Sequence, residues 1–337
     1  MLRFPGRRKS KPAVFATRKL PGNALDRLAE ETTLTVWPND LPPPREELLA
    51  AVSEAEGLLC LLTDNIDAAL LEAAPRLRAI STMAVGYDHI DVDTATRRGI
   101  VVTNTPGVLT ETTADFAFAL LLAAARRVAE AERAVREGRW TSWQPSLLLG
   151  RDVHEATLGI VGLGAIGRAV ARRARGFDMR VIYNSRHRQP ETEAELGVSY
   201  AEFDELLAES DFVSVHVALT PETRHLFDAA AFARMKPTAI FVNTARGAVV
   251  DEAALHHALE AREIAGAAID VAEVEPLGKH DPLLRLPNLL ATPHIASASV
   301  ATRTKMADVA VEDLRSALAG GQPENCVNPE VAGQETS

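Results

Sequence analysis

The sequence predicts an α/β protein with two doubly wound, parallel-sheet domains. Short apolar runs alternate with helical segments over the first hundred residues, and a second such series follows a long helical stretch. Strands separated by helices imply βαβ units and parallel sheets. The length of 337 residues exceeds the usual size of one core, and 47% hydrophobic with only 5% aromatic residues suits Ala-, Leu- and Val-packed layers.

The first series of strands is expected in five apolar runs. A proline-rich loop with Pro38 and residues 42–44 precedes a helix that begins near Arg45, because proline fixes φ and cannot donate a backbone hydrogen bond. The predicted strands are Ala13–Ala16, Leu34–Trp37, Gly57–Leu62, Leu77–Met83 and Ile100–Val102.

One continuous helix is predicted from Thr110 to about Arg136, with threonines 110, 112 and 113 as cap candidates and Gly138 as its end. We interpret it as the connector between the domains. The second series of strands is expected at Thr157–Val161, Arg180–Tyr183, Phe212–Val217, Ala239–Asn243, Gly266–Ile269 and Leu289–Thr292.

A last helix, Val300–Ala319, follows the second series and has no sheet of its own. It is therefore expected to return to the first domain, which becomes discontinuous. The predicted organisation is a disordered basic head over residues 1–12, a first domain over 13–107 plus 299–337, and a second domain over 108–298.

Composition excludes several classes of function. The net charge is −10 although residues 1–12 are basic, so the folded body is a poor partner for nucleic acid. Two cysteines, Cys60 and Cys326, are too few for a disulfide framework and show no metal-ligand spacing. No apolar run reaches the roughly 18 residues of a membrane span, and no signal peptide is recognisable. A reducing, cytoplasmic location is expected.

A glycine-rich turn, Gly162-Leu-Gly-Ala-Ile-Gly167, follows an apolar strand and opens a helix. Its first glycine permits a tight turn, Gly164 lets the backbone approach a pyrophosphate, and Gly167 lets helix pack on strand. Glycine turns without a ligand are common, but the strand, helix and second strand around this one favour a dinucleotide site.

The next strand indicates which dinucleotide is bound. An NAD site requires an acidic residue about 20 positions after the fingerprint, whereas this strand continues into Asn184-Ser-Arg-His-Arg188. Ser185 can hydrogen-bond a 2′-phosphate, and Arg186 or Arg188 can pair with it. NADP(H) is therefore favoured, NAD(H) is the second choice, and a solvated basic loop is the alternative.

Three residues after later strands have the chemistry for reducing a 2-keto acid. Arg246, in a loop at the carboxyl end of a strand, can clamp a carboxylate and polarise a carbonyl. His294 can donate a proton near neutrality, and Glu275 can stabilise its charged form. Each residue alone is more often structural. The other eight histidines show no metal-ligand spacing, so no metal is expected.

With these residues the chain resembles the D-2-hydroxyacid dehydrogenase family from about Ala13 to about Gly320. The matching segments occur in family order: Val85–Asp91, Gly162–Gly167, Asn243–Asp251, Asp270–Pro276 and Pro293–Ser297. The resemblance implies a flavodoxin-like substrate-binding domain and an NAD(P)-binding Rossmann domain, with the active-site cleft between them.

The resemblance also implies residue roles. Arg246 holds the substrate carboxylate, His294 paired with Glu275 donates the proton, and Asp270 contacts the nicotinamide carboxamide. Backbone amides at Val85 and Gly86 bind the substrate carboxylate. Further cofactor contacts are expected from Thr113, Ala165, Ile166 and Thr244, and further substrate contacts from Leu62, Ser297 and Trp143.

Within the family the chain is most similar to the glyoxylate and hydroxypyruvate reductases, by Gly57–Leu62, Ile80–Gly86 and Trp140–Trp143. The expected reaction gives glycolate and D-glycerate. Alternatives are another D-2-hydroxyacid dehydrogenase, a formate dehydrogenase, and a non-catalytic, cofactor-sensing scaffold of the same fold. A phosphoglycerate dehydrogenase would need a regulatory tail beyond position 337.

A homodimer is expected from the resemblance and from two aromatic residues after the connector helix. Trp140 and Trp143 are either interface anchors or part of the intramolecular core. In the first case Trp143 reaches the partner's substrate pocket beside Leu62.

Overall fold

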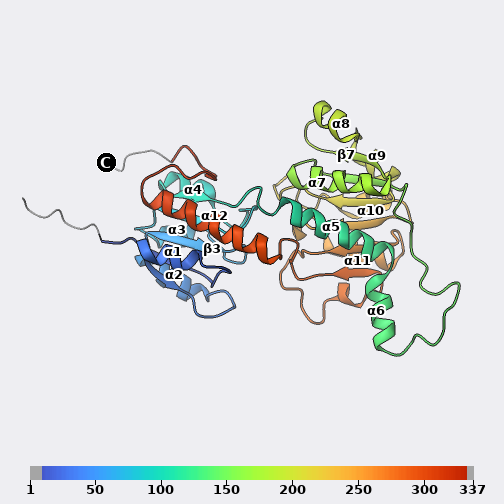
Figure 1. Cartoon of the computed structure of the whole chain (residues 1–337), viewed down its shortest axis with the longest axis horizontal. Coiled ribbons are helices and arrows are strands. Elements are labelled where there is room, and N and C mark those ends of the chain that lie inside the picture. The colour runs from blue at the N-terminus through green and yellow to red at the C-terminus, as the bar shows by residue number, and fades with distance from the viewer. Residues whose placement is uncertain (1–9, 332–337) are drawn as a thin grey trace, which may run out of the picture. The chain divides into compact units, whose positions relative to one another are not determined.

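The computed structural model describes residues 10–331, which form two compact units (Figure 1). The described part of the first unit comprises residues 10–109 and 299–331, and the second unit comprises 110–298. Most of the predicted basic head, residues 1–9, lies outside the described part of the chain. Among the described residues no helix is long and apolar enough to cross a membrane.

The first unit is a five-stranded parallel sheet in the order β2-β1-β3-β4-β5. Successive residues of β1 serve opposite faces: Val14 packs with α1 and α12, and Phe15 with α2, α3 and α4. The strands are β1 (Ala13–Ala16), β2 (Thr33–Val36), β3 (Gly57–Cys60), β4 (Ala79–Thr82) and β5 (Val101–Thr103). The helices are α1 (Ala24–Glu31), α2 (Arg45–Glu54), α3 (Ala68–Glu72), α4 (Val92–Arg97) and α12 (Val300–Leu318).

The second unit is a seven-stranded parallel sheet in the order β12-β11-β10-β9-β6-β7-β8. Its strands are β6 (Thr157–Val161), β7 (Arg180–Asn184), β8 (Ser199–Tyr200), β9 (Phe212–Val215), β10 (Ile240–Asn243), β11 (Gly266–Ile269) and β12 (Leu289–Ala291). Its α-helices are α5 (Thr110–Ala125), α6 (Val128–Arg136), α7 (Ala165–Ala174), α8 (Pro190–Leu196), α9 (Phe203–Glu209), α10 (Ala229–Arg234) and α11 (Glu252–Glu260). Three short 3₁₀ segments, η1 (Arg175–Phe177), η2 (Gly247–Val249) and η3 (Pro282–Arg285), complete it.

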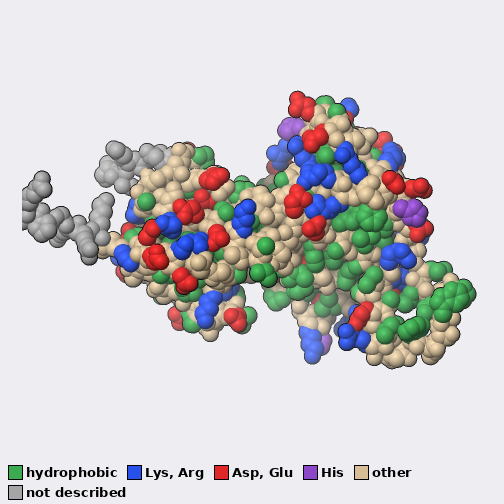
Figure 2. Space-filling model, viewed as in Figure 1, with side chains coloured by type: hydrophobic (Ala, Val, Ile, Leu, Met, Phe, Trp, Pro, Cys, Tyr) green, Lys and Arg blue, Asp and Glu red, His purple; other side chains and the backbone are tan. Residues whose placement is uncertain are grey.

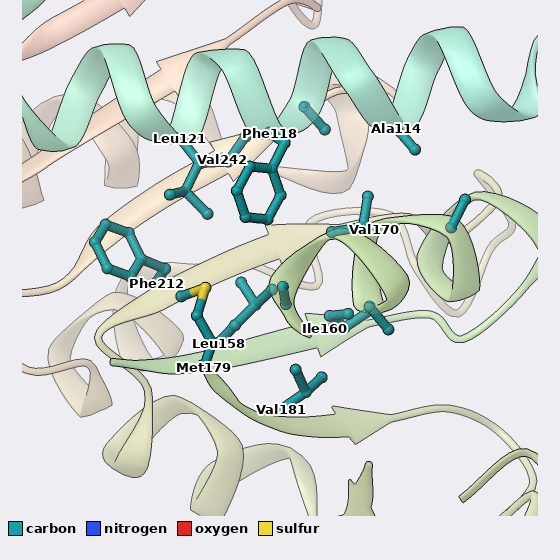
Figure 3. Close-up of a cluster of buried hydrophobic side chains, with 14 of the residues drawn as sticks. Ala114, Phe118, Leu121, Leu158, Ile160, Val170, Met179, Val181, Phe212 and Val242 are labelled. Carbon is teal, nitrogen blue, oxygen red and sulfur yellow. The ribbon is translucent and has the colours of Figure 1, made fainter. Parts of the chain in front are cut away.

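Helices cover both faces of this second sheet. Figure 3 shows Phe118 and Leu121 of α5 pointing toward the sheet whose strand β6 carries Leu158 and Ile160. Helix α7 packs on the same face, and α9, α10 and α11 pack on the other. Parallel sheets buried on both faces confirm the predicted doubly wound α/β class.

The predicted continuous helix from Thr110 to Arg136 is wrong, because the structure divides it into α5 and α6. Arg127, between them, has a left-handed backbone with φ of 53°. The carbonyl of Ala125 accepts a hydrogen bond from the amide of Arg151 at 2.8 Å. A continuous helix would give that carbonyl to the amide four residues later, so docking of the segment near Arg151 competes with continuation of the helix.

Helix α12 lies on the sheet of the first unit, against β3, β4, β5 and α1. The hydroxyl of Ser81, in β4, donates to the carbonyl of Ala310 in α12 at 2.8 Å, although 229 residues separate them. The last helix thus completes the first unit, where residues from the two ends of the chain share one core.

Candidate active site

The glycine turn after β6 has the steric properties expected of the fingerprint. Gly162 has φ of 98°, and a Cβ there would lie 2.7 Å from the carbonyl carbon of His216. A Cβ on Gly167 would lie 2.1 Å from the carbonyl oxygen of Gly162, so helix α7 packs directly on the turn. A Cβ on Gly164 would meet nothing within 4 Å. The open position is the one where a pyrophosphate must approach.

Helix α7 begins beside this open glycine, and no side chain caps it. A hollow of about 660 Å³ adjoins its first turn and is lined by Gly164, Ala165, Arg168 and Gln189, among others. Ile166 follows in the same turn and is partly exposed. Helix amides without a side-chain acceptor, next to an open hollow, fit an anionic group.

Thr244 provides a second observation that fits a bound cofactor. It follows β10 directly and is only 8% exposed, and its hydroxyl has no hydrogen-bond partner within the described part of the chain. Buried polar groups are rarely left unpaired, so an exception calls for an explanation such as a missing ligand. Thr113, also expected at the cofactor, is buried in the first turn of α5.

No carboxylate stands at the end of β7, which finishes at Asn184. The hydroxyl of Ser185 donates to the carbonyl of His187 at 2.7 Å. Arg186 is exposed, and its charge contributes weakly, after the hydrogen bond from Thr220, to lowering the pKa of Glu222. These two side chains border the loop that is expected to receive a 2′-phosphate.

Arg188 has a protein partner. Its Nε and Nη2 atoms donate to the two carboxylate oxygens of Glu193, each at 2.9 Å, and Tyr183 donates to the same carboxylate at 2.9 Å. The hydrogen bond from Arg188 holds the pKa of Glu193 below its usual range. Sequence reasoning missed Glu193. It lies five residues after Arg188, partly across an irregular loop, and this spacing does not predict an ion pair.

The loop that carries Arg246 is closed by Asn243. The Asn243 side chain donates to the carbonyl of Arg246 at 2.9 Å and accepts from the amide of Ala245 at 3.0 Å. The guanidinium of Arg246 donates to the carbonyl of Ala245 at 2.8 Å and also acts on Glu275, whose pKa it helps to lower. Arg246 therefore lies at the carboxyl end of β10, where its charge helps to stabilise the ionised carboxylate of Glu275.

The predicted pair of His294 and Glu275 is present. The Nδ1 atom of His294 lies 2.8 Å from Oε2 of Glu275, and their side chains are 23% and 29% exposed. Oε1 of Glu275 also accepts from the amide of Ala272 at 3.1 Å. Burial acts to raise the pKa of Glu275, but the hydrogen bond and charge of His294, with smaller effects of the Ala272 amide and of Arg246, hold this pKa below its usual value. A carboxylate on Nδ1 directs Nε2 of His294 to other partners.

Asp270 is buried and holds the loop of His294. One carboxylate oxygen accepts from the hydroxyl of Thr292 at 2.6 Å and the amide of Ile295 at 2.9 Å, and the other accepts from the amide of Ala296 at 2.7 Å. His294 itself has a left-handed backbone, with φ of 55°. The expected carboxamide contact of Asp270 stays a prediction, and the structure adds a role in shaping the turn that presents the imidazole.

The predicted substrate residues of the first unit follow two neighbouring strands, Leu62 after β3 and Val85 with Gly86 after β4. Asn104, which follows β5, donates from its side chain to the carbonyl of Val85 at 2.7 Å. This hydrogen bond helps to orient the backbone of the Val85 loop, including its amides. Sequence reasoning had not assigned Asn104 a role. All three loops lie at the carboxyl edge of one parallel sheet, where ligands bind in such folds.

Two further predicted substrate residues lie in the second unit. Ser297 is partly buried in the loop after His294. Trp143 is 79% exposed, and Trp140 is 62% exposed, so neither belongs to an intramolecular core. Among the described residues no group of three or more histidine, cysteine or acidic side chains could hold a metal ion.

Comparison with known proteins places these residues in a family context. Residues 118–296 match the NAD binding domain of the D-isomer specific 2-hydroxyacid dehydrogenases. A glyoxylate reductase of Korarchaeum cryptofilum is 54% identical over 322 residues, which covers 95% of this chain and 97% of that protein.

Solved structures of related proteins superpose on this chain over a similar span. A protein of Thermus thermophilus superposes with a TM-score of 0.88 at 49% identity, covering 94% of this chain and 99% of that one. An NADPH-dependent glyoxylate/hydroxypyruvate reductase of Sinorhizobium meliloti, in complex with NADP and malonate, superposes with a TM-score of 0.84 at 33% identity, covering 97% and 100%. The family resemblance of the sequence is thereby confirmed.

Proposed function

Because the chain belongs to the D-isomer specific 2-hydroxyacid dehydrogenase family, we propose that it reduces glyoxylate and hydroxypyruvate, with NADPH as the preferred hydride donor. The products are glycolate and D-glycerate. The hydrogen bond between His294 and Glu275 carries this proposal, because it prepares a proton donor beside a fixed guanidinium.

The chain's own residues account for proton transfer and substrate binding. His294 donates a proton from Nε2 to the keto oxygen, and Glu275 stabilises the imidazolium before that step. Arg246 binds the substrate carboxylate and stabilises the negative charge that develops on the keto oxygen. The amides of Val85 and Gly86 bind the same carboxylate, and Leu62 and Ser297 complete the substrate contacts.

The glycine turn, the start of α7 and the unpaired hydroxyl of Thr244 would hold the cofactor. Bound NADPH supplies the hydride that reduces the keto carbon. Asp270 holds the turn on which His294 stands, and it would also contact the nicotinamide carboxamide of a bound cofactor.

NADPH preference rests on the end of β7. A carboxylate at that point would repel the 2′-phosphate, and none is present. Arg186 supplies the main attraction, because Arg188 is already bound to Glu193 by two hydrogen bonds. Ser185 adds a neutral hydrogen bond after its hydroxyl rotates away from the His187 carbonyl. An NADPH-dependent reductase among the similar structures supports the same preference.

A homodimer is proposed from an exposed apolar surface of the second unit. Figure 2 shows apolar side chains gathered over α5 and along the loop that follows α6. In that loop Trp140, Trp143 and Leu149 are 62%, 79% and 67% exposed. A hollow of about 730 Å³ lies between α5, α6 and the edge strand β12. Leu149 lines this hollow, and exposed large apolar side chains together with an edge strand are typical of an interface between copies.

The two cysteines support a cytoplasmic location. Cys60 is buried and Cys326 is partly buried, both are free thiols, and burial raises the pKa of each. Free thiols persist in a reducing compartment.

One steady-state experiment tests the reaction: glyoxylate, hydroxypyruvate and pyruvate are each assayed with NADH and NADPH. We expect the highest kcat/KM for glyoxylate or hydroxypyruvate with NADPH. Absence of turnover with every pair would contradict the enzyme proposal, and faster turnover of pyruvate would contradict the substrate assignment.

Sedimentation tests the dimer, and a fully active monomer would reject it. An unchanged KM in Trp143→Ala would reject contact of Trp143 with the substrate.

A further inference from the structure

The first unit buries an ion pair that the proposed reaction does not use. Arg18, just after β1, and Asp64, after β3, have side chains 8% and 1% exposed, and Nη1 of Arg18 lies 3.5 Å from Oδ1 of Asp64. Burying charges costs free energy that their attraction often only offsets. Two apolar residues could fill the same space without loss of stability, so stability alone does not explain this pair. Its hydrogen bonds indicate what else it does.

Asp64 closes a tight turn that begins at Leu61. Its Oδ2 atom accepts from the amide of Leu61 at 2.8 Å and from the hydroxyl of Thr17 at 2.5 Å. The amide of Asp64 donates in turn to the carbonyl of Leu61 at 3.0 Å. The turn is therefore closed from both ends and tied to the residue that follows β1.

Arg18 strengthens the tie to the segment after β1 and adds one more segment, the one after β2. Its Nη2 donates to the hydroxyl of Thr63 at 3.1 Å, its Nη1 to the carbonyl of Thr17 at 2.6 Å, and its Nε to the carbonyl of Asp40 at 3.0 Å. These contacts join the segments after β1, β2 and β3 at the carboxyl edge of the sheet. The planar guanidinium is suited to this because its donors have fixed directions.

Leu62 is the residue that this arrangement leaves free to face a ligand. Its neighbours Leu61 and Thr63 are both held, by Asp64 and Arg18 respectively, while Leu62 itself is only partly buried. The neighbouring strand ends in the Val85 loop, which Asn104 holds in a similar way. Contacts must be held within about half an ångström for a binding site to be effective, and residues behind the contact provide that precision.

We propose that the Arg18–Asp64 pair is a positioning device that fixes the turn carrying Leu62 and thereby sets the KM for the keto acid. The inference rests on the proposed function, because the role of Leu62 as a substrate contact belongs to it. Neither Arg18 nor Asp64 touches the substrate. Both act through the backbone on either side of Leu62.

The test compares Asp64→Asn, Leu62→Ala and the double variant. In Asp64→Asn we expect the KM for glyoxylate and for hydroxypyruvate to rise roughly tenfold, with kcat within about threefold of the wild type. The dissociation constant of NADPH, measured by fluorescence titration, should not change. Because Asp64 acts through Leu62, the KM of the double variant should equal that of Leu62→Ala rather than the product of the two effects.

Asp67→Asn is the matched control. Asp67 is another carboxylate of the same connection; it pairs with Arg45 and caps α3 through the amide of Leu70. Its replacement should lower the melting temperature and leave the KM unchanged. If Asp64→Asn does not fold, Thr17→Val is the second variant. It removes the hydroxyl that donates to the Asp64 carboxylate and should give a smaller increase in KM.

An unchanged KM in a folded variant that weakens Asp64, or independent effects of Asp64 and Leu62, would overturn the inference and leave the pair as an element of stability. Wild-type turnover tests the proposed function separately. If the wild type reduces neither keto acid, both conclusions fall. If it does and the KM of Asp64→Asn is unchanged, only the inference falls.

Discussion

Gly247 lies so close to the backbone of Ala272 that a Cβ at position 247 would sit 1.8 Å from the Ala272 carbonyl carbon. The contact joins two loops, one that follows β10 and carries Arg246 and one that follows β11 and leads to Glu275. The three atoms nearest to that Cβ all belong to the backbone, so direct backbone packing sets the relative position of the two loops.

Gly247→Ala should therefore damage both stability and catalysis. Relief of a 1.8 Å contact with backbone requires one loop to move, and such overpacking costs at least about 2 kcal/mol. We expect kcat to fall at least about tenfold, because the two loops carry Arg246, the proposed substrate ligand, and Glu275, the proposed partner of the proton donor. Gly278→Ala is the control, since a Cβ there meets nothing within 4 Å. Equal kcat in both variants would show that the loops adjust freely.

The chemistry of the site is tested by His294→Gln and Arg246→Ala. In the proposed mechanism both residues act on substrate oxygens, so turnover should fall roughly a hundredfold or more in each variant while NADPH binding stays nearly intact. His280→Gln replaces an exposed histidine and should have no effect on turnover. Near-normal reduction by either site variant would contradict the assigned role of that residue.

Much of this site could be predicted from sequence because the strand ends are sharply marked. The bounds predicted for β6 and β11 are those observed. Arg246 follows the buried strand β10, and His294 follows the partly buried edge strand β12. Apolar runs ending in small polar residues define the edge of a parallel sheet, and parallel strands bring such ends together. Distant residues such as Glu275 and His294 could thus be paired before their geometry was known.

Other features depend on contacts that leave no local pattern. The break at Arg127 arises because the amide of Arg151 takes the Ala125 carbonyl, and neither glycine nor proline marks the position. Strand β8, Ser199–Tyr200, is two residues long and has no periodicity to detect. The hydrogen bonds from Ile295 to Asp270 and from Thr17 to Asp64 join residues 25 and 47 positions apart, which one sequence cannot reveal.

Glu275→Gln should move the falling limb of the reductive pH profile to lower pH, because the imidazolium loses its stabilising charge. The pKa of Glu275 lies below its ordinary 4.5, so the carboxylate is charged throughout the neutral range. The stability that its ionisation adds is present above 4.5 and is lost as the pH falls through the lowered value. Glu273→Gln, which removes a carboxylate bound to His225, is the matched control. A profile that does not move would show that Glu275 does not support the proton donor.

The proposed preference for NADPH depends on which arginine is free to bind a 2′-phosphate. Arg188 is engaged by Glu193 in two hydrogen bonds, and Arg186 is exposed. A charge-assisted contact contributes about 1.5 to 3 kcal/mol, and each 1.4 kcal/mol is tenfold in affinity. Arg186→Ala should therefore weaken NADPH binding roughly tenfold or more and leave NADH binding nearly unchanged, while Arg188→Ala should have a smaller effect.

Glu193→Gln provides the opposite change. It removes the charge that holds Arg188, so the released guanidinium can turn to the 2′-phosphate and the preference for NADPH should increase several-fold. Ser185→Asp with Arg186→Ala should lower or invert the preference, because the new carboxylate repels the phosphate and can accept the ribose hydroxyls of NADH. Dissociation constants for both cofactors, measured for all of these variants, give the answer. If the wild type bound the two cofactors equally, or the double variant still favoured NADPH, the end of β7 would not be where the cofactor is selected.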